Sequence, residues 1–203
     1  MPRGRPARTR RALSLAALLA ALALAPSAAR AADDETLRAG VFDPPRAAPA
    51  FALIGSDGAE LTLARYAGKI VILEFGFTSC PDICPTTLNT LAQARKQLGA
   101  AAEELQVVYI TVDPARDDAA QLKKYLASFD PSFVGGTGSE EQLAAVRRDY
   151  GIAADRKDTG DSYAYSHSSY TYLIDRSGTL RALMPYGHPP ADYVHDVQIL
   201  LKR

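Results

Sequence analysis

Two continuous runs of apolar and β-branched residues, 70–77 and 105–112, dominate the middle of the chain. Runs of this length without polar alternation are typical of strands that are buried on both faces of a sheet. Pro85 follows the first run, and proline is favoured in the first turn of a helix, where its missing N–H costs no hydrogen bond. Apolar residues then recur at helical spacing up to Leu98. The pattern predicts a strand, a helix and a second buried strand.

Shorter patterns surround this centre. Residues 50–63 contain two apolar stretches around a turn-rich segment and predict an N-terminal hairpin. Ser139 and Gln142 have the spacing of a capping box and predict the start of a helix. Residues 170–174 and 179–184 predict two strands joined by a tight turn.

Helical spacing also recurs over residues 122–129 and 194–201, whereas residues 153–162 are polar and predict a solvated loop. The predicted order is hairpin, strand, helix, strand, two helices, two strands and a helix. Such an order is typical of the α/β class. We therefore expect one domain over residues 49–203, with a central mixed β-sheet flanked by helices and an N-terminal β-hairpin.

The first 31 residues have a different character. They contain six arginines and no acidic residue, and an apolar run occupies residues 12–25. That run is shorter than the roughly 20 residues needed to span a bilayer. A basic head, a short apolar run and small residues before Ala32 predict a secretory signal peptide over residues 1–31. The alternative is an uncleaved membrane anchor. We expect a periplasmic or otherwise extracytoplasmic protein, with residues 32–48 as a flexible linker.

Charge and cysteine content narrow the function classes. The whole chain has 23 basic and 23 acidic residues, but beyond residue 31 the numbers are 17 and 23, a net charge of −6. A nucleic-acid-binding protein would have a basic excess, so no nucleic-acid partner is expected. Two cysteines are too few for a four-cysteine zinc or iron–sulfur site.

Both cysteines, Cys80 and Cys84, lie between the first buried strand and the predicted helix. A helix N-terminus lowers the pKa of a thiol and favours the thiolate, which binds soft metals and attacks disulfides. Residues four apart on a helix bring both sulfurs within reach of one metal ion or of each other. A structural disulfide would close so short a loop that it would constrain the unfolded chain little. A metal site and a redox couple are therefore favoured over a structural disulfide.

A metal held by two thiolates needs a further donor, and the chain has three histidines. His167 precedes the predicted strand 170–174. If that strand runs antiparallel beside 70–77, His167 lies next to the end that carries the cysteines. His188 follows the next strand and is the alternative at the same edge, whereas His195 is interpreted as an ordinary helix residue.

The chain resembles the Sco/SenC family of copper chaperones from about Phe51 to its end. The resemblance rests on FTSCPDICP at residues 77–85, DPARD at residues 113–117 and a histidine before a Tyr-Leu-Ile strand, in the family's order and with similar spacing. It implies a thioredoxin-like fold and copper, as Cu(I) or Cu(II), held by Cys80, Cys84 and His167.

The resemblance also implies roles for residues around the ligands. Asp82 would be a neighbour of the metal rather than a ligand, and Asp113 would lie near the site, although an Asp-Pro pair after a strand also favours a simple turn. The sequence departs from the family at Ser166, where an aspartate is usual, and at Asp118-Ala119, where Thr-Pro is usual. Both departures concern the surroundings of the ligands rather than the ligands themselves.

The function implied by the resemblance is that of a metallochaperone. It would assist assembly of the dinuclear copper centre of cytochrome c oxidase, with a copper-accepting oxidase subunit and other periplasmic copper carriers as partners. The alternative is a thiol–disulfide oxidoreductase in which Cys80 and Cys84 cycle between dithiol and disulfide and keep a target's cysteines reduced. A peroxidase is disfavoured because the arginine-supported single-cysteine pattern is missing. The need for His167 separates the first two hypotheses.

Overall fold

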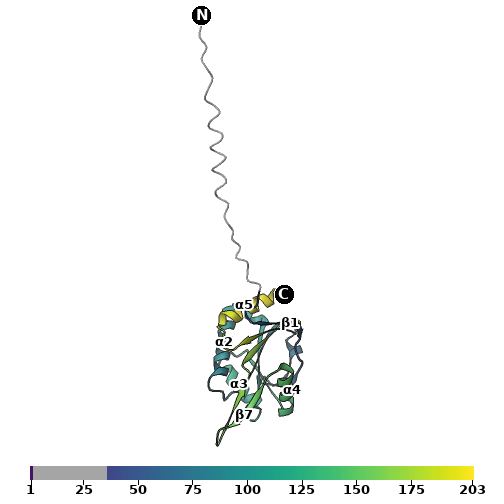
Figure 1. Cartoon of the computed structure of the whole chain (residues 1–203), viewed down its shortest axis with the longest axis vertical. Helices are drawn as coiled ribbons and strands as arrows, with labels where there is room; N and C mark the ends of the chain where they lie inside the picture. The colour runs from purple at the N-terminus through teal and green to yellow at the C-terminus, as the bar shows by residue number, and fades with distance from the viewer. Residues whose placement is uncertain (2–35) are drawn as a thin grey trace. The chain divides into compact units, whose positions relative to one another are not determined.

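The computed structural model describes Met1 and residues 36–203. Residues 36–203 form an eight-stranded mixed sheet with helices on both faces and a separate two-stranded hairpin (Figure 1). In sheet order the strands are β1 (Gly40–Ala47), β10 (Thr179–Pro185), β9 (Tyr170–Ile174), β4 (Ile70–Gly76), β5 (Leu105–Thr111), β6 (Val134–Thr137), β2 (Ala52–Gly55) and β3 (Glu60–Thr62). Strand β4 pairs parallel with β5 and antiparallel with β9. The predicted mixed sheet and the predicted neighbour of the cysteine-bearing strand are both confirmed.

The helices are α2 (Ile83–Leu98), α3 (Ala119–Ala127), α4 (Glu140–Tyr150) and α5 (Pro190–Leu201), with short 3₁₀ turns η1 (Leu63–Tyr66) and η2 (Gly99–Glu104). All seven residues of β4 are buried. Ile70 and Ile72 pack in the core formed with α2, α3 and α5, whereas Val71, Leu73 and Phe75 pack in the core formed with α4. This alternation explains why the strand is apolar throughout, because both of its faces are covered.

Several local predictions are confirmed. Strands β2 and β3 form the N-terminal hairpin. Helix α4 begins with the capping box, in which the Ser139 side chain accepts from the Gln142 N–H and the Gln142 side chain accepts from the Ser139 N–H. The turn between β9 and β10 closes with Gly178 at a φ of 78°, a conformation that favours glycine.

The flexible linker predicted over residues 32–48 is wrong where β1 pairs antiparallel with β10. Seven of the eight residues of β1 are exposed, so the strand has no apolar alternation by which the sequence could reveal it. Its position is set by backbone pairing and by the preceding residues. The N–H groups of Arg38 and Ala39 donate to the buried Asp196 carboxylate of α5 at 2.8 and 2.9 Å.

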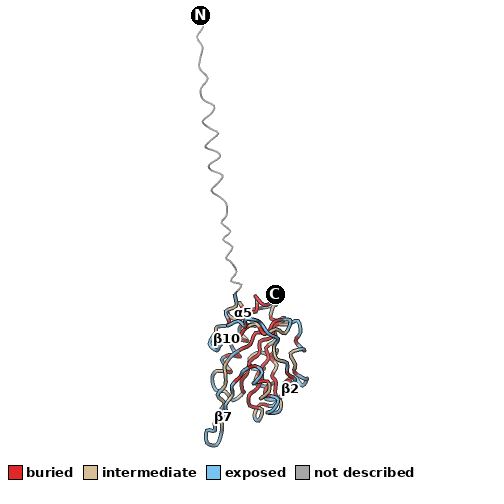
Figure 2. Tube along the Cα trace, turned by 45° about the vertical axis from the view of Figure 1, so that its right-hand side comes forward, coloured by how far each residue is buried: buried red, intermediate tan, exposed pale blue. Residues whose placement is uncertain are grey.

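The solvated loop predicted over residues 153–162 is also wrong. This region forms strand β7 (Ala154–Asp158), which pairs antiparallel with β8 (Tyr163–His167) and with no other strand of the described chain. The hairpin extends away from the body of the domain, and Figure 2 shows its far end exposed. Its polar side chains gave no sign of a strand, because neither strand lies in the buried sheet.

The signal peptide expected over residues 1–31 lies outside the described residues, apart from Met1. Within the described part of the chain, no helix is long and apolar enough to cross a membrane.

Candidate metal centre

The two cysteines flank the junction between the central strand and the first long helix. Cys80 lies in the loop after β4, with its N–H donating to the Phe77 carbonyl at 3.2 Å, and Cys84 lies in the first turn of α2. Pro85 follows within the same turn, as the sequence predicts. Both cysteines are free thiols, Cys80 half-buried and Cys84 completely buried. The fold therefore brings both sulfurs to the carboxyl end of β4.

The surroundings of Cys80 stabilise its thiolate. A hydrogen bond from the Cys84 thiol, followed by backbone N–H groups of residues 82–84, lowers the pKa of Cys80 to about 5 against the opposing effect of burial. These N–H groups belong to the start of α2, where they have no partner within the helix. Asp82 is exposed at the N-cap, and its side chain makes no capping hydrogen bond. The helix end thus acts on Cys80 through its backbone.

Cys84 is held in the opposite state. Its hydrogen bond to Cys80, and then its burial, raise its pKa well above the ordinary value. Gly76 makes room for it, because a Cβ at that position would lie 2.9 Å from the Cys84 sulfur and would overlap the Tyr109 hydroxyl. The pair therefore combines one thiolate that is accessible and one thiol that is enclosed by the core.

His167 is the last residue of β8 and lies at the base of the hairpin. Its Nε2 is 3.7 Å from the Cys84 sulfur, and its Nδ1 is 2.9 Å from the Ser168 carbonyl oxygen. A carbonyl can only accept, so Nδ1 is the donor in the contact with Ser168, and Nε2 is the ring nitrogen that faces the Cys84 sulfur. Phe77, at the end of β4, packs edge-on against the imidazole with ring centroids 5.9 Å apart.

This geometry can be compared with that of a metal site. At metal–donor distances of about 2.0–2.3 Å, as in zinc sites, a sulfur and a nitrogen on one ion lie roughly 3.5–3.8 Å apart. The 3.7 Å between Cys84 and His167 falls in that range. Among the described residues, no group of three or more Cys, His, Asp or Glu side chains already has the arrangement of a formed metal site. Cys80, Cys84 and His167 are therefore adjacent side chains rather than a closed coordination shell.

The other two histidines pair with carboxylates. His188 Nδ1 lies 2.8 Å from Asp192, and His195 Nδ1 lies 2.9 Å from Asp196. His167, in contrast, has its Nε2 directed at the sulfur of Cys84. His167 therefore differs from His188 and His195 in facing a cysteine sulfur instead of a carboxylate.

The segment Asp113–Asp117 has a larger role in the fold than a turn. Asp117 is fully buried and accepts hydrogen bonds from the N–H and the hydroxyl of Thr78 at 2.9 and 2.6 Å. Thr78 lies in the loop between β4 and α2, residues 77–82, which carries Cys80 and is called the cysteine loop below. Asp113 accepts from the Tyr163 hydroxyl in the hairpin at 2.9 Å. Sequence analysis places Asp113 near the site but gives no role to Asp117. The signal for it is a second aspartate four residues on, after a strand that ends in threonine.

The two departures from the family pattern lie at the margin of the site. Ser166 is exposed and alternates along β8 with the half-buried Tyr165 and His167. Asp118 is the N-cap of α3, where its side chain accepts from the Gln121 N–H at 2.7 Å.

A buried carboxyl group lies on the same strand as the cysteine loop. Glu74 is 1% exposed, and its Oε2 has no hydrogen-bond partner among the described residues. Burial, and then the negative charge of Cys80, raise the pKa of Glu74 well above its ordinary value. The sequence places Glu74 within the predicted buried strand but assigns no role to its carboxyl group.

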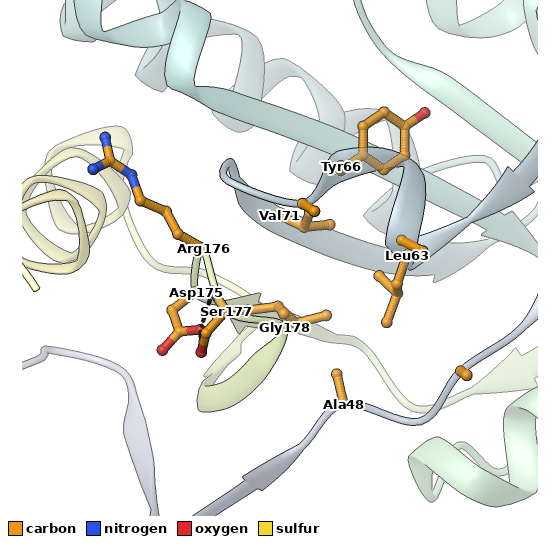
Figure 3. A pocket seen from close by; sticks show the side chains of 12 residues that line it. Ala48, Leu63, Tyr66, Val71, Asp175, Arg176, Ser177 and Gly178 are labelled. Carbon is orange, nitrogen blue, oxygen red and sulfur yellow. Dashed lines mark hydrogen bonds between the residues drawn. The ribbon is translucent and has the colours of Figure 1, made fainter.

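A cavity of about 190 Å³ lies at the other end of β4 (Figure 3). Val71 of β4 lines it, together with the turn between β9 and β10 and residues of η1. Asp175 and Ser177 are hydrogen-bonded to each other at its edge. No cysteine or histidine lines this cavity, so it is separate from the candidate metal centre.

Comparison with known proteins identifies relatives of this chain by sequence and by structure. The SCO1/SenC family model matches residues 42–202. The SCO2-like protein RC0895 of Rickettsia conorii is 40% identical over 131 residues, a match that spans 63% of this chain and 64% of that protein. The solution structure of apo Sco1 from Thermus thermophilus is 33% identical, with a TM-score of 0.74, and the match covers 82% of this chain and 98% of that one.

A second solved structure is that of Arabidopsis thaliana ScoI with copper bound. It is 32% identical, with a TM-score of 0.72, and the match covers 77% of this chain and 99% of that one. These likenesses confirm the predicted thioredoxin-like fold with its central mixed sheet and flanking helices. This chain belongs to the SCO1/SenC family.

Proposed function

We propose that the protein is a copper chaperone that binds one copper ion through Cys80, Cys84 and His167. The observation that carries the proposal is the 3.7 Å contact between the Cys84 sulfur and Nε2 of His167, beside the hydrogen-bonded thiol pair. Two thiolates select a soft ion such as Cu(I), and an added imidazole also suits Cu(II). Copper in the related plant ScoI structure supports the choice of metal.

Copper is the cargo of this function, and the proposed recipient is a respiratory oxidase subunit. The protein would supply copper during assembly of the dinuclear centre of cytochrome c oxidase, with periplasmic copper carriers as further partners. We infer that residues 1–31 direct export, so that this exchange takes place outside the cytoplasm. A mature protein that begins near Ala32, as measured by intact mass, is the expected result; retention of residues 1–31 in a membrane fraction would indicate an anchor instead.

Copper reconstitution of the reduced protein tests the ligand set. His167→Ala removes one of three donors, and we expect Cu(I) affinity, measured by competition with a chromophoric chelator, to fall by more than about 100-fold, beyond the effect of losing a supporting group. His188→Ala is the matched control, since its imidazole pairs with Asp192, and should bind copper as the parent does. A larger loss in His188→Ala than in His167→Ala would overturn the assignment.

A second candidate function follows from the low pKa of Cys80. The Cys80 thiolate can attack a disulfide in a target to form a mixed disulfide and release one target thiolate. The Cys84 sulfur then attacks Cys80, which yields the Cys80–Cys84 disulfide and the reduced target and transfers two electrons in total. His167 takes no part in this exchange as a ligand. Rapid exchange with a model disulfide that is unaffected by His167→Ala, together with copper binding that is equal in the oxidised and reduced forms, would favour this function.

A further inference from the structure

The segment Asp113–Asp117 lies between the two halves of the candidate metal centre. It leaves the end of β5 and leads into α3. Asp117 accepts a hydrogen bond from the cysteine loop. Asp113 and Arg116 form hydrogen bonds with Tyr163 of the β7–β8 hairpin. Within the described part of the chain, this segment alone forms side-chain hydrogen bonds to both Thr78 and Tyr163.

On the cysteine side, Asp117 collects three hydrogen bonds. Its carboxylate accepts from the N–H of Thr78 at 2.9 Å, from the Thr78 hydroxyl at 2.6 Å and from the Thr111 hydroxyl at 2.7 Å. The side chain is fully buried, so these bonds are not exchanged for bonds to water. Thr78 is two residues before Cys80, and this carboxylate therefore fixes where the cysteine loop leaves β4.

On the histidine side, the partner is Tyr163 at the start of β8. Its hydroxyl donates to Asp113 at 2.9 Å, and its carbonyl accepts from Arg116 at 3.1 Å. Arg116 also pairs with the 1%-exposed Asp113 carboxylate, and its guanidinium carbon lies 3.9 Å from the centroid of the Tyr163 ring. Both the backbone and the ring of Tyr163 are thus held.

The position of Tyr163 determines that of His167. Residues 163, 165 and 167 alternate with exposed residues along β8, so their half-buried side chains share one face of the strand. Phe77 contacts the second and third of these side chains, with ring centroids 5.9 Å away in both cases. The hairpin has no backbone pairing with the main sheet, so side-chain contacts of this kind must hold it in place.

We propose that Asp113, Arg116 and Asp117 form a brace that sets the distance between the thiol pair and His167. They are positioning residues: Asp117 acts on the cysteine loop, and the other two act on His167 through Tyr163. The inference rests on the proposed copper function, because it describes how the third ligand of that site is placed. The inference goes beyond that function because it makes copper affinity depend on three residues that contact neither a cysteine sulfur nor the His167 imidazole.

Tyr163→Phe tests the histidine side of the brace, because it removes the hydrogen bond to Asp113 and keeps the aromatic ring. We expect Cu(I) affinity to fall about ten-fold, the size of effect typical of a supporting group. In a His167→Ala background, the same change should alter affinity by less than about two-fold, since the ligand it positions is gone. The reduction potential of the Cys80–Cys84 disulfide should stay unchanged.

The control is Tyr66→Phe, which also removes a buried tyrosine hydroxyl but lines the cavity at the other end of β4. It should leave Cu(I) affinity unchanged. Equal losses from Tyr163→Phe with and without His167, or no loss in either background, would overturn the brace. Failure of the copper proposal is distinguishable, because it appears in the His167→Ala single variant as parental affinity.

Two further variants separate the two sides of the brace. Arg116→Lys keeps the charge beside Asp113 but loses the planar fork, and should reproduce the pattern of Tyr163→Phe. Thr78→Val removes the hydroxyl that donates to Asp117 and should weaken copper binding in both His167 backgrounds while shifting the disulfide reduction potential. Thr78→Val that behaves like Tyr163→Phe in all three measurements would contradict the assignment of Asp117 to the cysteine loop.

Discussion

The two halves of the candidate metal centre are built in different ways. The cysteine loop joins a completely buried strand to a helix whose apolar face lies in the main core, and Cys84 itself is 0% exposed. The histidine belongs to a hairpin whose strands pair only with each other, and most of whose residues are exposed or half-buried. The thiols are therefore fixed by the core of the domain, whereas the imidazole is fixed by a few polar and aromatic contacts.

This difference bears on what the site can do. A group held by the core moves only with global unfolding, whereas a peripheral hairpin can open locally at a smaller free-energy cost. The thiol pair can thus keep its geometry and its redox chemistry while His167, the proposed third ligand, approaches or withdraws. Such an arrangement suits the proposed function, in which copper is held and then released.

The largest expected effect comes from disturbing the cysteine half. In Gly76→Ala the new methyl would overlap the fully buried Tyr109 and would come within 2.9 Å of the Cys84 sulfur. Overpacking of this kind costs about 1–3 kcal/mol of unfolding free energy. Because Cys84 must shift, Cu(I) affinity should fall as well. Urea denaturation and chelator competition measure the two effects.

Gly40→Ala is the matched control for this change, since a Cβ there meets only the Leu183 carbonyl oxygen at an ordinary 3.6 Å. It should leave both quantities near their parental values. Parental stability and parental copper binding in Gly76→Ala would show that the cysteine half is less rigid than the structure implies.

The cysteine half could be predicted from the sequence because its signals are local. The apolar strand, the CPDIC segment and Pro85 follow one another within sixteen residues, and each has its own structural preference. The pairing with β9 placed His167 at the correct end of the sheet. What the sequence could not show is the hairpin, because its support comes from Asp113, fifty residues away from Tyr163, and not from its own polar pattern.

The same reasoning explains why the sequence did not predict strand β1 or the environment of Glu74. Strand β1 is held by backbone pairing and by Asp196, which is about 157 residues away along the chain, so its exposed residues look like a linker. Glu74 lies in a run that the sequence predicts to be buried, and only the three-dimensional structure shows that its Oε2 is enclosed without a hydrogen-bond partner among the described residues. The position of β1 and the enclosure of Glu74 both depend on contacts between segments that are far apart in the sequence, and the spacing of apolar residues does not show such contacts.

A second prediction concerns Glu74, which lies on β4 in the cysteine half of the site. Its folded-state pKa is raised above the ordinary 4.5, first by burial and then by Cys80. Below about pH 4.5 the carboxyl is protonated in both states, but above it only the unfolded chain releases the proton, so rising pH lowers stability. Glu74→Gln should remove this loss, which amounts to at most about 1.4 kcal/mol per pH unit.

Denaturation curves of Glu74→Gln and the parent at pH 4.5, 6.0 and 7.5 measure this difference. The gain in unfolding free energy from the substitution should increase from the lowest to the highest pH. Glu141→Gln, which changes an exposed carboxyl of α4, should show no such trend. A gain that is independent of pH would mean that the Glu74 carboxyl titrates alike in the folded and unfolded states.

The smallest effect is expected on the hairpin side, from Arg156. Its guanidinium carbon lies 3.8 Å from the centroid of the Tyr163 ring, which therefore lies between this arginine and Arg116. Arg156 is exposed, and an exposed cation–π contact contributes about 0.5–1 kcal/mol. Arg156→Gln should accelerate amide hydrogen exchange over residues 163–167 and should lower Cu(I) affinity less than Tyr163→Phe does. Exchange in β4 should stay as slow as in the parent, because that strand opens only with the whole domain. Faster exchange in β4 would mean that the hairpin and the core open together, and the contrast between the two halves of the site would then be lost.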